Sequence, residues 1–76
     1  MLTVSKLNIG SIYLATGDNT QSERWLNDAL EGAKQQKDSA LMEKCYINLG
    51  IVGKKTGDTQ GAIQNYRSSL LLSRRL

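Results

Sequence analysis

The sequence contains no histidine, no proline and no phenylalanine, and it has a single cysteine, Cys45. Histidine is the side chain that most often acts as a general base near neutral pH, so its absence argues against an enzyme. Without histidine and with a single cysteine, the chain lacks the ligands of a zinc cluster, and one cysteine cannot form an internal disulfide. We therefore expect a non-catalytic protein with no cofactor and no metal site, in a reducing intracellular compartment such as the cytoplasm.

Long apolar runs and strong charge are missing as well. No stretch approaches the roughly 18–20 apolar residues that cross a bilayer, and the first residues lack the pattern of a secretory signal. The net charge is +3, which suits a neutral or acidic partner but is too small to indicate nucleic acid. The pair Lys54-Lys55 lies where a predicted helix ends, and basic residues are favoured there anyway. We therefore expect no membrane partner and no nucleic-acid partner.

The sequence does contain an internal repeat. The segment 8–18, NIGSIYLATGD, returns forty positions later at 48–58 as NLGIVGKKTGD. Identical residues at this offset are Asn8/Asn48, Gly10/Gly50, Thr16/Thr56, Gly17/Gly57, Asp18/Asp58 and Leu30/Leu70. A repeat of this period indicates one supersecondary unit used twice, and such units stack into solenoids that present surface for binding.

Apolar residues at helical spacing predict four helices, and no strand pattern occurs. The first helix is expected over 3–15. The signals that end or begin the helices are Gly17, Asp18 or Thr20, Asp38 or Ser39, and Gly57-Asp58. Because the glycine turns are short, the helices on either side of each turn should be antiparallel neighbours. The predicted fold class is all-α.

Each helix is expected to bury one apolar stripe. The predicted stripes are Leu2, Ile9, Ile12 and Tyr13 in the first helix; Ser22, Trp25, Leu26, Ala29, Leu30 and Ala33 in the second; Leu41, Cys45, Leu49 and Val52 in the third; and Ala62, Ile63, Tyr66, Leu70 and Ser73 in the fourth. Cys45 is thus predicted to be a small buried apolar residue and not a reactive thiol.

These features resemble the tetratricopeptide repeat. The residues that carry the resemblance are Ile9-Gly10 and Leu49-Gly50 for its leucine–glycine pair, Gly17-Asp18 and Gly57-Asp58 for its turn, and Ser22 and Ala62 for its small residue. The resemblance implies one domain over 1–76, with repeats at about 3–36 and about 43–76, of an extended type of about 40 residues. It implies an α-solenoid of two helix–turn–helix units that acts in protein–protein interaction, as a scaffold or adaptor.

In proteins that look like this, the first helices of successive repeats line a concave groove. The resemblance directs these residues into it: Asn8, Ser11, Lys44, Ile47, Asn48, Ile51, Lys54 and Lys55. An asparagine side chain both donates and accepts hydrogen bonds, so Asn8 and Asn48 can pair with the backbone of a bound peptide. Alternatively, the two asparagines solvate a helix face or hold the contact between repeats.

Two functions are therefore predicted. The first is an interaction module that binds a peptide or a helix in its groove. The alternative is a self-associating repeat that forms a homo-oligomer without a separate ligand, because repeat proteins usually need about three units and a polar cap. A homo-oligomer is expected in either case, by end-to-end stacking or by domain swapping. A nucleic-acid-binding repeat is a third and much weaker alternative, and catalysis ranks last.

Overall fold

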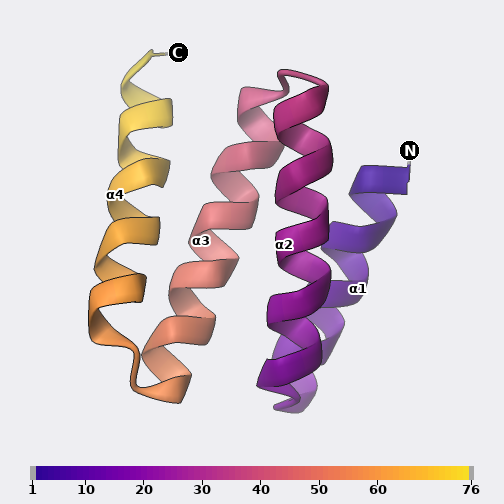
Figure 1. Ribbon diagram of the computed structural model, residues 1–76, viewed down its shortest axis with the longest axis vertical. Coiled ribbons are helices and arrows are strands. Elements are labelled where there is room, and N and C mark those ends of the chain that lie inside the picture. The colour runs from indigo at the N-terminus through magenta and orange to yellow at the C-terminus, as the bar shows by residue number, and fades with distance from the viewer. Residues whose placement is uncertain (1, 76) are drawn as a thin grey trace.

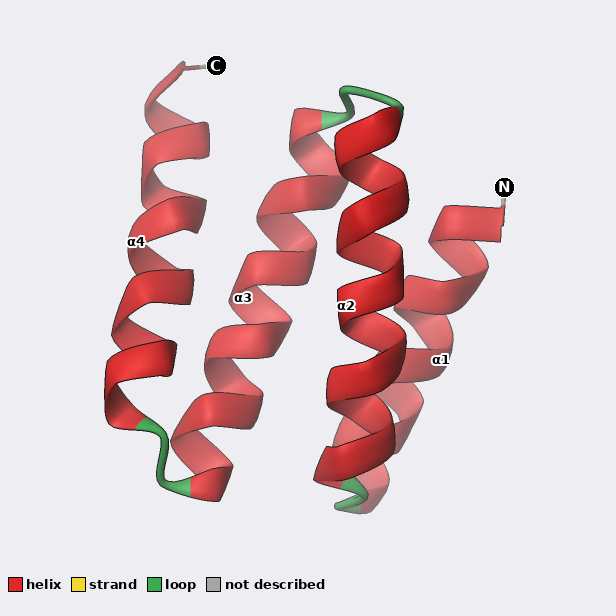
Figure 2. Cartoon of the chain, in the orientation of Figure 1, coloured by secondary structure: helices red, strands yellow, loops and turns green. Residues whose placement is uncertain are grey.

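The computed structural model describes residues 2–75 and consists of four helices joined by short turns (Figures 1 and 2). They are α1 (Leu2–Thr16), α2 (Asn19–Gln35), α3 (Ser39–Thr56) and α4 (Thr59–Arg75). No strand occurs within the described residues, so the predicted all-α class is confirmed. Residues 1 and 76, at the ends of the expected domain, lie outside the described part.

Glycine and aspartate form the turns as predicted. Gly17 and Gly57 have φ angles of 89° and 85°, in the left-handed region that glycine enters without steric cost. Asp18 caps α2 by accepting a hydrogen bond from the Gln21 amide, and Asp38 caps α3 in the same way. These local signals fix where the helices begin and end.

The helices pack in chain order. Helices α1 and α2 form one antiparallel pair, α3 and α4 form another, and α2 joins the pairs by packing on α3 (Figure 1). In the view of Figure 1, α1 and α4 lie at opposite ends, and α2 lies in front of α1 and α3. Within the described residues α4 contacts only α3, whereas α3 contacts all three other helices.

The core lies where α3 meets the first helix pair. Its buried members are Leu7, Leu14, Leu26, Ala29, Leu30, Cys45, Leu49 and Val52. The stripes predicted for the second and third helices are mostly confirmed, although Trp25 and Leu41 are only partly buried. Burial also raises the pKa of the Cys45 thiol to about 11, so the predicted inert thiol is consistent with the structure.

The stripe predicted for the first helix is largely wrong, because Leu2 and Ile12 are exposed and Ile9 and Tyr13 are only partly buried. Ile12 is 63% exposed, and α1 instead buries Leu7, Gly10 and Leu14. The cause is Gly10, because a Cβ atom added there would lie 2.8 Å from Leu26 Cγ. Close approach of α2 at this glycine turns the Leu7–Gly10–Leu14 face inward and leaves Ile12 on the surface.

The stripe predicted for the fourth helix is also largely wrong. Ala62 and Ser69 are buried, whereas Leu70 is 53% exposed and Ile63 and Tyr66 are exposed too. The helix turns its small residues toward α3, its only neighbour in the described part of the chain. A second neighbour would be needed to cover the larger apolar residues, so this face of α4 stays open.

Candidate functional site

A groove of about 400 Å³ lies between α1 and α3, the two helices behind α2 in Figure 1. It is lined by Val4, Leu7, Asn8, Ser11, Leu41, Lys44, Ile47 and Asn48. The helices contribute four residues each. Both sets follow helical spacing, so each comes from one face of its helix.

The two walls of the groove are the same face of the repeated unit. Asn8 and Asn48 occupy equivalent positions, as do Leu7 and Ile47. Apolar side chains supply contact area, and the asparagines supply donors and acceptors beside it. Such a surface can hold an extended chain or a helix by apolar contact together with a few hydrogen bonds.

The two asparagines have different surroundings. Asn48 Nδ2 donates to Ser11 Oγ at 3.0 Å, and Ser11 Oγ donates to the Leu7 carbonyl at 3.0 Å. This chain of hydrogen bonds ties α3 to α1, so Asn48 holds the contact between the repeats. Asn8, the equivalent residue of the first repeat, is exposed. Asn8 is therefore the asparagine available to a ligand.

The charge of the groove is positive. Lys44 is the one charged residue among those that line it, and its side chain is exposed. Lys55 was expected in the groove, but its Nζ donates to the Leu14 carbonyl at 3.3 Å, at the C-terminal end of α1. There the ammonium group is favoured by the helix dipole.

The structure thus brings together five of the eight expected site residues and leaves three aside. The five are Asn8, Ser11, Lys44, Ile47 and Asn48; the other three, Ile51, Lys54 and Lys55, are not part of the lining. Three lining residues were not among the expected eight: Val4, Leu7 and Leu41, the last of which was assigned to the core. A signal was available, because Leu41 lies three residues before Lys44 and seven before Asn48, on the same side of the helix.

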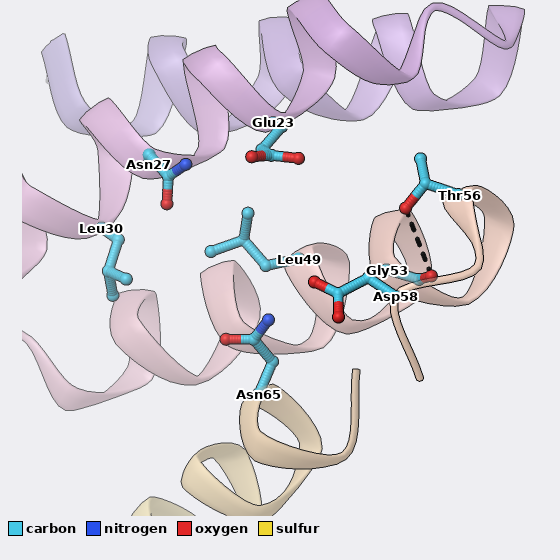
Figure 3. Close-up of a pocket in the computed structure, with 8 residues that line it drawn as sticks. All are labelled: Glu23, Asn27, Leu30, Leu49, Gly53, Thr56, Asp58 and Asn65. Carbon is cyan, nitrogen blue, oxygen red and sulfur yellow. Dashed lines mark hydrogen bonds between the residues drawn. The ribbon is translucent and has the colours of Figure 1, made fainter. Parts of the chain in front are cut away.

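A smaller hollow of about 150 Å³ lies between α2, α3 and the start of α4 (Figure 3). Its polar side chains include Glu23, Asn27, Thr56, Asp58 and Asn65. Asp58 Oδ1 already accepts the Gly61 amide at 3.0 Å as a helix cap, and Thr56 Oγ1 donates to the Gly53 carbonyl. Because these groups stabilise the turn, the hollow is the weaker candidate for a site.

Two further classes of feature are missing from residues 2–75. No group of three or more cysteine, aspartate, glutamate or histidine side chains is placed there to hold a metal ion. None of the four helices is both long enough and apolar enough to cross a bilayer. The groove between α1 and α3 is therefore the site that we consider further.

Comparison with known proteins agrees with this architecture. The family model described as "Tetratricopeptide repeat" matches residues 2–75. No curated protein and no solved structure gave a significant match. The family match covers both helix pairs, the glycine–aspartate turns and the close contact at Gly10, on which the resemblance rested. The chain therefore belongs to the tetratricopeptide repeat family.

Proposed function

We propose that the chain is an interaction module that binds a peptide in the groove between α1 and α3. Tetratricopeptide repeats generally mediate protein–protein interactions, and stacked helical repeats commonly use a concave surface for this purpose. The observation that carries the proposal is the lining of the groove. It combines exposed hydrogen-bonding and apolar side chains from the first helix of both repeats.

The preferred ligand is a neutral or acidic segment. Lys44 is the one charge in the lining, and no carboxylate lies beside it there. An acidic side chain of the ligand would therefore meet an attractive charge, whereas a basic one would be repelled. The apolar lining residues, such as Leu41 and Ile47, would contact one face of the ligand and add affinity without strict sequence specificity.

Selection from a random peptide library displayed on phage tests this proposal. A selected peptide should bind the wild-type chain, and Lys44→Glu or Asn8→Ala should weaken binding by about threefold to tenfold, as expected for one lost polar contact. Both residues are exposed, so their replacement should leave the fold intact. Asn48 is a poorer choice, because its hydrogen bond to Ser11 joins the repeats.

Arg67→Glu is the matched control. It reverses one positive charge, as Lys44→Glu does, but Arg67 is an exposed residue of α4, outside the groove. Binding of the same peptide should be unchanged by this variant. The proposal is wrong if the library yields no binder, or if Lys44→Glu and Arg67→Glu weaken binding equally.

A further inference from the structure

The first helix pair packs one of its faces against α3, whereas the equivalent face of the second helix pair has no neighbour among the described residues. In the first pair, α3 covers Leu7, Leu14, Leu26 and Leu30, all of them buried. Forty positions later the same places hold Ile47, Lys54, Tyr66 and Leu70, all of them exposed. The second pair thus presents a largely apolar surface of the kind that α3 covers in the first.

The complementary half of this contact is also open, at the other end of the molecule. Helix α3 covers the first pair with Cys45, Leu49 and Val52, which are buried. The equivalent residues of α1 are Ser5, Ile9 and Ile12. Ser5 and Ile12 are exposed and Ile9 is partly so. The chain therefore carries both halves of an interface that it already forms once internally.

We propose that a second copy of the chain docks head to tail, with its α1 on the α3–α4 face of the first. This contact would repeat the packing of α3 against α1 and α2. Ile12 of the second copy would take the place of Val52, and Tyr66 and Leu70 of the first would take the places of Leu26 and Leu30. The proposal does not require a ligand in the groove, although Ile47 belongs to both surfaces.

The contact between copies is weaker than the contact between repeats. The internal contact includes hydrogen bonds from Asn48 to Ser11 and from Lys55 to the Leu14 carbonyl. Between copies neither recurs, because Ile51 stands in place of Ser11 and Ala15 in place of Lys55. With Lys54 in place of a leucine as well, we expect dissociation constants of roughly 10 μM to 1 mM.

The geometry also predicts the form of the assembly. Two different faces meet, so every copy that docks leaves one open face of each kind. The contact is heterologous and does not close on itself as a two-fold dimer does. Assembly should therefore continue past the dimer as concentration rises, giving short chains of copies.

A complementation experiment with two variants tests this inference. Ile12→Glu blocks the α1 face and Leu70→Glu blocks the α4 face, and both side chains are more than half exposed. Each variant alone should sediment as a monomer of 8.4 kDa. An equimolar mixture should form a dimer and nothing larger, because one intact face of each kind remains. The wild type should exceed the dimer mass as its concentration approaches about 1 mM.

Gln64→Glu is the matched control. It places the same charge at an exposed position of α4, on the side of the helix away from Leu70, and it should assemble like the wild type. Circular dichroism checks that each variant is folded, and Ile12→Gln with Leu70→Gln repeats the test if a glutamate variant has lost its helical signal.

Three results would overturn the proposal. They are a wild type that stays monomeric throughout, a folded Ile12→Glu or Leu70→Glu variant that self-associates alone, and a mixture of these two variants that fails to pair.

Discussion

The two helix pairs are built from the same unit, yet they bury different amounts of it. Leu30 and Leu70 are identical residues at equivalent positions, but Leu30 is 9% exposed and Leu70 is 53% exposed. The difference comes from the neighbour, because α3 covers the first pair and no helix of the described chain covers the second. In a stacked repeat, the place of a residue in the array decides whether it belongs to the core or to the surface.

The largest expected effect tests this comparison directly. Leu30→Ala should destabilise the fold by about 2–5 kcal/mol, because it leaves a cavity between α2 and α3. Leu70→Ala should change the free energy of unfolding by less than about 1 kcal/mol, because that side chain is half in water already. Urea unfolding of both variants at low concentration measures the difference. Equal losses in the free energy of unfolding would contradict the comparison, because they would mean that Leu30 and Leu70 are equally buried.

A smaller difference is expected at the paired glycines. A Cβ atom added at Gly10 would lie 2.8 Å from Leu26, which is fully buried, so Gly10→Ala should cost about 1–3 kcal/mol. At Gly50 the neighbour is the Tyr66 ring, at the same 2.8 Å, but Tyr66 is exposed and can move away. Gly50→Ala should therefore cost less, and thermal unfolding of the two variants compares them. A larger loss at Gly50 would contradict this account.

The smallest difference is expected between the two asparagines. Asn48→Ala removes the hydrogen bond to Ser11 across the repeats and should cost about 1 kcal/mol. Asn8→Ala removes an exposed side chain and should change stability by less than about 0.5 kcal/mol. Ser11→Ala should destabilise about as much as Asn48→Ala, and the double variant should cost less than the sum of the two, because both changes break one bond. Strict additivity would show that the hydrogen bond does not contribute to stability.

Local signals made most of the fold predictable. Gly17 and Gly57 end helices because the left-handed conformation favours glycine, and Asp18 and Asp38 begin them as caps. These effects depend on a few adjacent residues, so the sequence is sufficient to find them. The offset of forty residues then identified the two helix pairs as copies of one unit.

The buried faces of the outer helices could not be predicted in the same way. Apolar residues surround α1 on several sides, including Leu7, Ile9, Ile12 and Leu14, so periodicity does not select one face. Close packing at Gly10 makes the selection, and it depends on how α2 approaches. For α4, the stripe at Ile63, Tyr66 and Leu70 was recognised correctly as apolar, but its burial requires a neighbour that the described residues do not supply.

The site was predictable to a similar degree. Five of the eight expected residues line the groove, because Asn8 and Lys44 belong to helical rows that the repeat aligns. Lys55 was misplaced because a long flexible side chain can reach several partners. The carbonyl at the end of α1, which accepts its hydrogen bond, becomes a neighbour only after folding. Spacing along one helix carries no information about such contacts.

The central claim is that the groove between α1 and α3 binds the ligand. Mapping backbone amide shifts by NMR, while a phage-selected peptide is added, tests it most directly. The account predicts that the largest changes fall in α1 and α3, around Asn8, Ser11 and Lys44, and that α4 changes little. Changes centred on Tyr66 and Leu70 instead would contradict the claim, because they would place the ligand on the open face of α4.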